Sequence, residues 1–220
     1  MKLEAKTLAV LKNYALINPS ILFKEGDVIS TISPSKSILA KAKVPNTFSR
    51  RCAVYELTKL LGGISIAEDP EISFDTGSVI IKDKRSVQKI PYTPEESIKT
   101  PPEKNIVLGS TAVTLSVTDA DIKNVIKAAG NYGLPEIAFV GDGATLAFQA
   151  VDAKNPNSSS YSIPVGTTDK SFRVIFKVEN ILKLMAGDYE VVICAKPLVA
   201  HFKNADIEYW VAVETTSNFD

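Results

Sequence analysis

Histidine and cysteine are nearly absent from this chain, which has one histidine, His201, and two cysteines, Cys52 and Cys194, in 220 residues. No His-x-x-His, Cys-x-x-Cys or Gly-x-Ser-x-Gly sequence occurs, so the common spacings of metal ligands and activated nucleophiles are missing. The two cysteines stand far apart in apolar, strand-like surroundings, which predicts buried thiols in a reducing, intracellular setting. We therefore expect no metal, no cofactor and no catalytic residues.

An excess of one charge and a long apolar run are missing as well. The 25 basic and 25 acidic side chains cancel, which excludes a generally basic nucleic-acid coat but not a local basic patch. No uncharged stretch is longer than 105–118, which is shorter than the ~20 residues that cross a bilayer. Charged residues from Glu4 to Lys12 interrupt any signal-peptide core, so we expect a protein that is not exported.

The remaining candidates for chemistry each have a simpler structural interpretation. His201 falls in an expected edge strand or hairpin, and Trp210 alternates with Tyr209 in a strand, which favours core or interface packing. Gly141-Asp142-Gly143 lies between two strand patterns and predicts a hairpin turn rather than a phosphate loop. The adjacent acids Glu95-Glu96 lie in a proline-rich segment, where we expect them to be solvated.

That proline-rich segment, 92–105, divides the chain near its middle. Proline fixes φ and removes backbone donors, so the segment is typical of an extended connector. The predicted organisation is a first domain at 1–91, a connector at 92–105 and a second domain at 106–220.

The same order of elements is expected on both sides of the connector. Helical patterns at about 6–17 and 119–132 each precede a proline and then a pair of strands predicted to form a hairpin. A shorter helical pattern follows in each half, Leu57–Gly62 and Glu179–Gly187, and three strand patterns close it. Alternating apolar and polar residues in these strands indicate antiparallel sheets with one wet face. The prediction is α+β with one module written twice, and two unrelated α+β domains are the alternative.

The helices carry lysines on the face opposite their apolar stripe. At 100° per residue, Lys6, Lys12 and Asn13 oppose the apolar side of the first helix. Lys123 and Lys127 do so on the second long helix, and Lys59 and Lys183 belong to the shorter helices. Any one of these can be a solvated surface lysine, but their recurrence in both halves favours phosphate contact without base reading.

Several segments resemble the sliding clamps of T-even-type bacteriophages. The likeness begins with Met1-Lys-Leu, Thr7–Asn13 and Ser20–Lys24, and it covers nearly the whole chain, connector included. It continues through these segments: Tyr55–Gly62, Ala186–Tyr189, Ala195-Lys196 and Tyr209–Glu214. The connector is richer in Glu and Lys than the resemblance leads us to expect, which leaves partner specificity open.

The resemblance implies a DNA polymerase processivity factor with no reaction of its own. It implies a head-to-tail homotrimer, a ring with sheets outside and helices lining the pore around duplex DNA. It further implies a replicative polymerase and an ATP-dependent clamp loader as partners, a site in the cytoplasm of the infected host, and a role in late viral transcription. The positions matching the family's basic pore lining are Lys2, Lys6, Lys12, Lys59, Lys123, Lys127 and Lys183. Partner peptides would bind beside the connector, near Tyr92 and Ile98.

Two other functions fit parts of the sequence. A β-rich phage structural or adhesion protein without DNA binding would account for the many strands and the serine-rich turn. A hydrolase or transferase with a dispersed site is the other alternative, and His201 is its most obvious base.

Overall fold

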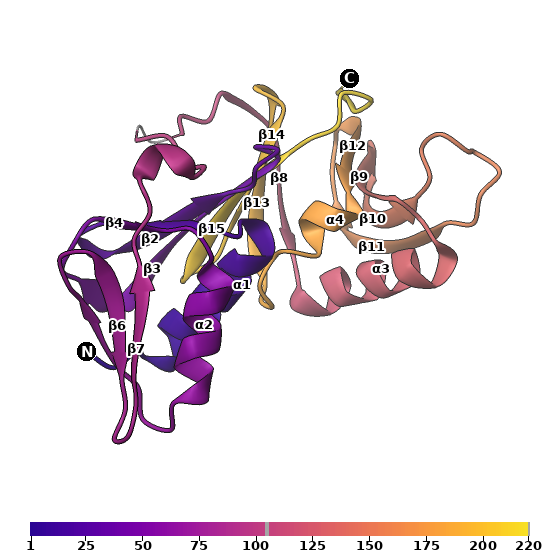
Figure 1. Ribbon diagram of the computed structural model, residues 1–220. Helices are drawn as coiled ribbons and strands as arrows, with labels where there is room; N and C mark the ends of the chain where they lie inside the picture. Colours follow the sequence, from indigo (N-terminus) through magenta and orange to yellow (C-terminus); the bar gives the residue numbers. More distant parts are fainter. Residues whose placement is uncertain (104–105, 220) are drawn as a thin grey trace. The chain divides into compact units, whose positions relative to one another are not determined.

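The computed structural model describes residues 1–103 and 106–219 and divides into two compact units, Met1–Lys104 and Asn105–Asp220. Both units are α+β (Figure 1). The elements of unit 1 are α1 Ala5–Ile17, β1 Ile21–Phe23, β2 Gly26–Ile32, β3 Ile38–Phe48, β4 Cys52–Val54, α2 Leu57–Ile66, β5 Glu71–Phe74, β6 Ser78–Lys82, β7 Val87–Pro91 and the 3₁₀ helix η1 Glu95–Ser97. The elements of unit 2 are β8 Ser110–Val117, α3 Asp119–Tyr132, β9 Glu136–Asp142, β10 Thr145–Val151, β11 Tyr161–Thr167, β12 Ser171–Lys177, α4 Val178–Ile181, β13 Tyr189–Lys196, β14 Val199–Lys203, β15 Ile207–Ala212 and β16 Asn218–Phe219.

Unit 1 contains three sets of antiparallel strands. β1 pairs with β4, β2 pairs with β3, and β5, β6 and β7 form a meander. Met1 extends the meander, because its ammonium donates to the Ile72 carbonyl at 2.6 Å and its carbonyl accepts from the Ile72 N–H at 2.8 Å. The predicted hairpin between β1 and β2 is wrong. The chain turns at Gly26, where φ is +110°, and β1, buried at all three positions, takes β4 as its strand partner instead.

Unit 2 contains two antiparallel arrangements. The order β11-β10-β9-β12-β16 forms one sheet, and β8, β13, β14 and β15 pair in succession. Here the predicted hairpin is confirmed, because β9 pairs with β10 across the turn at Gly143. Asp142 stabilises this turn by accepting from the N–H groups of Ala144 at 3.0 Å and Thr145 at 2.7 Å.

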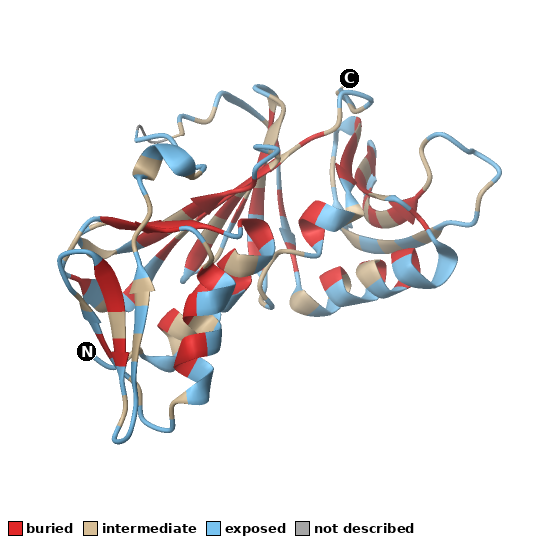
Figure 2. Ribbon diagram, viewed as in Figure 1, coloured by how far each residue is buried: buried red, intermediate tan, exposed pale blue. Residues whose placement is uncertain are grey.

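The long helices bury one side each, as Figure 2 shows by colour. α3 has the predicted bounds because local signals fix both ends. Thr118 and Asp121 form a capping box at its start, and Gly133, with φ +64°, takes the left-handed conformation that ends it. Ile122, Val125 and Ala129 are buried on α3, and no helix among the described residues is long and apolar enough to span a membrane.

The shorter helices differ from their predicted lengths. α2 continues past Gly62 to Ile66, whereas α4 ends at Ile181, well before Gly187. The α4 segment loses its helical repeat because Leu182 and Lys183 enter a turn, in which the Lys183 N–H bonds the Asn180 carbonyl at 3.2 Å.

Matching backbone hydrogen bonds relate the two units. The Leu57 N–H at the start of α2 donates to the Pro19 carbonyl at 2.7 Å, and the Val178 N–H at the start of α4 donates to the Pro135 carbonyl at 3.0 Å. Likewise, a segment near the end of each unit bonds an earlier strand of that unit. The Thr93 N–H donates to the Ala53 carbonyl of β4 at 3.0 Å, and the Glu214 N–H donates to the Ile175 carbonyl of β12 at 2.9 Å. These bonds show that one module occurs twice, and they make the residues that they join equivalent in the two copies.

Candidate functional site

Lys12 and Lys127 occupy equivalent places on the two long helices. Each follows a buried valine by two residues: Val10, which is 2% exposed, precedes Lys12, and Val125, which is 0% exposed, precedes Lys127. Both lysine side chains are exposed, and neither has a hydrogen bond or ion pair with another residue in ranges 1–103 and 106–219. These two ammonium groups are therefore available to an external anion.

Three other predicted lysines are held by carboxylates of their own unit. Lys2 pairs with Asp69 at 2.6 Å, Lys59 pairs with Glu56 one helical turn away, and Lys123 pairs with Asp119. The hydrogen bond from Lys123, together with one from the Gly187 N–H, lowers the pKa of Asp119 below its ordinary value. An anion approaching these lysines must compete with a carboxylate already in place.

The remaining two predicted lysines differ from Lys12 and Lys127. Lys6 and Lys183 are only partly exposed and both interact with their surroundings. Lys183 lies in the turn after α4 rather than on a helix. It is also not equivalent to Lys59, which lies two residues after its anchor residue Leu57, whereas Lys183 lies five residues after Val178. The predicted recurrence of lysines on the short helices is therefore wrong.

The exposed face of α1 is narrower than the helical repeat predicts, because Asn13 does not belong to it. Asn13 is 9% exposed, because α1 packs against both β3 and α2 and so buries a broader arc than a helix with one neighbour. Thr7 is 0% exposed on the same helix for this reason. Lys12 is the one cation of α1 in the exposed class, since Lys6 is only partly exposed.

The connector is fastened to unit 1 over the part that the structure describes; its last two predicted residues, 104 and 105, lie outside the described residues. The Tyr92 hydroxyl donates to the Asp75 carbonyl at 3.0 Å, and the buried Asn18 amide donates to the Lys99 carbonyl at 3.0 Å. Tyr92 and Ile98, the predicted partner-binding residues, are both half-buried in this arrangement.

The adjacent acids Glu95 and Glu96 were expected to be solvated; Glu96 is exposed, and Glu95 is partly exposed but also paired with a cation. The two carboxylate oxygens of Glu95 accept a two-pronged bond from Arg51, at 2.8 Å from Nε and 2.7 Å from Nη2. Arg51 also reaches Glu103 at 3.3 Å, and Glu103 pairs with Lys24 at 3.0 Å. These cations lower the pKa of Glu95 and of Glu103. Arg51 and Asn18 were missed because nothing in the local sequence pairs them with a segment more than 40 residues away.

His201 packs against neighbouring side chains, and the two cysteines are buried. The His201 ring stacks on Trp210 with centroids 4.6 Å apart, and its Nε2 lies 3.0 Å from a Glu208 carboxylate oxygen. Both cysteines are buried free thiols as predicted, and burial raises the pKa of Cys52 to about 11. No group of three or more metal-ligating side chains occurs in the described part of the chain.

Two copies of an α+β module, each with antiparallel strands and two helices, define the class of DNA-clamp folds. A solved beta clamp from Helicobacter pylori bound to a DNA ligase peptide has this fold, with a TM-score of 0.73 and 12% identity over 98% of the present chain. The present chain spans 65% of that clamp's length.

Sequence comparisons show similarity to phage sliding clamps. Residues 115–215 match the model described as "gp45 sliding clamp, C terminal". The sliding clamps of Escherichia phage RB69 and Enterobacteria phage T4 are 27% and 28% identical to the chain over 229 residues, covering all of each chain. Over its whole length the chain is therefore similar to the sliding clamps of these phages.

Proposed function

We propose that this chain encircles duplex DNA as a homotrimeric ring and tethers the replicative polymerase of a phage to its template. The observation that carries the DNA contact is the equivalence of Lys12 and Lys127, two exposed, unpaired ammonium groups at the same place in both modules. A repeated point charge on a helix suits contact with phosphates at any sequence. Because a closed ring is linked to DNA topologically, weak contacts suffice and the net charge of zero is no obstacle.

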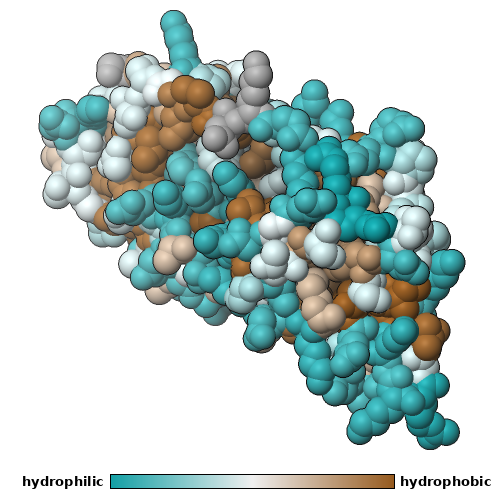
Figure 3. Space-filling model, turned by 90° about the vertical axis from the view of Figure 1, so that its left-hand side faces the viewer, coloured by the Kyte–Doolittle hydropathy of each residue, from teal (hydrophilic) through white to brown (hydrophobic). Residues whose placement is uncertain are grey.

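The proposed trimer uses two sheet edges. β7 ends its sheet in unit 1, and β11 ends the five-stranded sheet of unit 2, so each has one side without a strand partner within its own unit in the described part of the chain. Open edges pair readily with another strand, and head-to-tail pairing of β7 with β11 can close a ring. Val87 on β7 is 68% exposed, one of several apolar side chains that break the hydrophilic surface of this unit; Figure 3 shows such apolar areas on one face.

The proposed partners follow from the family. The replicative polymerase would insert a peptide near Tyr92 and Ile98, where the pinned connector offers a fixed, half-buried surface. An ATP-dependent clamp loader would open the ring, all in the cytoplasm of the infected host, and a supporting role in late viral transcription is part of the proposal.

Two measurements test the proposal. Light scattering should give about three times the 23.8 kDa of one chain. Polymerase product length on a primed circular template should increase when the protein, loader and ATP are added together. A stable monomer, or an unchanged product length with an active loader, would contradict the proposal and favour a β-rich structural protein.

A further inference from the structure

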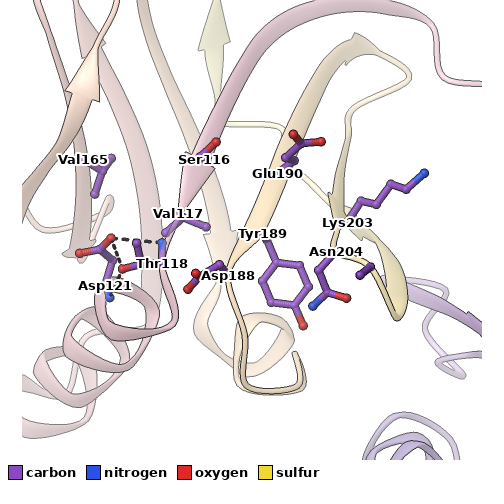
Figure 4. Close-up of a pocket in the computed structure, with 11 residues that line it drawn as sticks. Ser116, Val117, Thr118, Asp121, Val165, Asp188, Tyr189, Glu190, Lys203 and Asn204 are labelled. Carbon is purple, nitrogen blue, oxygen red and sulfur yellow. Dashed lines mark hydrogen bonds between the residues drawn. The ribbon is translucent and has the colours of Figure 1, made fainter.

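A pocket with a volume of about 600 Å³ lies in unit 2 where β8 meets α3. Its apolar wall includes Val117 of β8, Val165 of β11 and Tyr189 of β13. Its acidic side chains are Asp121, Asp188 and Glu190. Figure 4 shows Asp188 between the capped helix start, where Thr118 and Asp121 bond each other, and the ring of Tyr189.

The duplicated module supplies the equivalent place in unit 1. In unit 1, Met1 pairs with Ile72 through two backbone hydrogen bonds, and in unit 2, Leu115 pairs with Val191. Met1 and Leu115 are therefore equivalent. The residues that follow them, Lys2 and Ser116, are equivalent as well. The cross-strand pairs agree with this alignment. Glu71 lies opposite Lys82, and Glu190 lies opposite Lys203. Asp69 and Asp188 each precede the glutamate by two residues.

Unit 1 fills this place with its own cation. The Lys2 ammonium lies 2.6 Å from a carboxylate oxygen of Asp69. The hydrogen bond to Asp69, and the charges of Asp69 and Glu71, raise the pKa of Lys2 above its ordinary value. The acidic pair of this module therefore binds an ammonium group where one is present.

Unit 2 has the same acids and lacks the cation, because Ser116 replaces the lysine. Asp188 uses one oxygen, Oδ1, to accept the Asp119 N–H at 2.8 Å, and its Oδ2 has no hydrogen bond among the described residues. Glu190 is exposed and forms no ion pair in the described part of the chain. Figure 4 shows the Lys203 side chain extending away from Asp188, and its ammonium lies 3.8 Å from a carboxylate oxygen of Glu208.

We propose that this pocket binds a lysine or arginine side chain of a partner protein, presented beside an apolar residue. The free carboxylate oxygens of Asp188 and Glu190 take the cation, as Asp69 takes Lys2 in unit 1. Val117 and Val165 take the neighbouring apolar side chain. Charge complementarity thus decides the occupant, and an acidic peptide is excluded.

The experiment titrates the full chain with the capped dipeptide acetyl-Arg-Leu-amide and follows amide NMR shifts, with acetyl-Gln-Leu-amide as the uncharged probe. Saturable shifts at Val117, Asp188 and Glu190 are expected with the arginine probe and much weaker ones with glutamine. Ser116→Lys installs the cation of unit 1 and should weaken arginine-probe binding about tenfold, equivalent to about 1.4 kcal/mol.

Matched variants complete the test. Ser110→Lys adds the same charge at the far end of β8, where the exposed side chain lies about 20 Å away at ~3.3 Å per residue, and should change affinity less than twofold. Lys2→Ser should create a second set of shifts around Asp69 and Glu71. Equal shifts with both probes, or undiminished binding in Ser116→Lys, would overturn the proposal. A changed oligomer mass in Ser116→Lys would assign the pocket to a second copy of the chain and overturn the partner assignment.

Discussion

Replacing Lys12 and Lys127 together by glutamine should remove most of the direct phosphate contact proposed for this chain. Both ammonium groups are exposed and have no carboxylate partner among the described residues, so phosphates meet no internal competitor there. The matched control is Lys59→Gln with Lys123→Gln, which lowers the net charge by the same amount but removes lysines already paired with Glu56 and Asp119.

The expected magnitude follows from counterion release. Each phosphate neutralised contributes about 0.9 to the slope of log affinity against log salt, so two lysines contribute about 1.8 per chain in contact with DNA. Between about 50 and 200 mM salt, a fourfold change, the parent should lose roughly tenfold more affinity than the Lys12/Lys127 variant.

Fluorescence anisotropy of a short labelled duplex measures this quantity, because a duplex with free ends cannot be trapped by topology. The control pair should lower the salt slope by less than half as much as the test pair. If both pairs lower it equally, the overall field of the protein and not contact at the two equivalent positions governs binding, and the reasoning from equivalence fails.

Two further predictions concern stability. Gly133→Ala should destabilise the protein by about 1 kcal/mol in chemical denaturation, because Gly133 has φ +64°. Its control is Gly130→Ala inside α3, which has open space at its Cβ and should be neutral or stabilising by up to ~1 kcal/mol. Equal effects of the two substitutions would show that the helix does not end as described. Burial lowers the pKa of His201 below 6.5, so the unfolded chain binds more protons and stability should fall as pH drops below about 6.5. His201→Gln should flatten that part of the stability curve measured by urea unfolding, and an unchanged slope would mean that His201 does not titrate differently on folding.

The sequence was informative where a local pattern sets the structure. Thr118, Asp121 and Gly133 mark the ends of α3 by capping chemistry, and alternation along β13 and β15 identifies their buried faces. The partner of β1 was not predictable, because a three-residue strand buried on every side carries no alternation that would select β4 over β2.

The helical repeat also does not predict which candidate lysines are paired with a carboxylate. The repeat places Lys12 and Lys123 alike on exposed faces, but the ion pair to Asp119 depends on side-chain conformation within one turn. The burial of Asn13 depends on α1 having two neighbours, and the hold of Arg51 on Glu95 spans 44 residues. The burial of Asn13 and the Arg51–Glu95 bond arise from tertiary contacts, which a single-sequence periodicity does not encode.

Equivalence between modules is a stronger criterion for a DNA-facing residue than exposure alone. A ring assembled from repeated modules presents the same position of each module to an axial ligand, so a charge that occurs in both copies acts at every module, whereas one that occurs once acts at alternate modules. Lys12 and Lys127 meet this condition and would give six similarly placed ammonium groups in the proposed trimer. Lys59 does not, since its counterpart two residues after Val178 is Asn180. The two modules also differ at equivalent positions. In the pocket of unit 2, Ser116 occupies the position that Lys2 has in unit 1. Positions at which the copies agree thus point to the shared DNA contact, and positions at which they differ point to functions that only one copy performs.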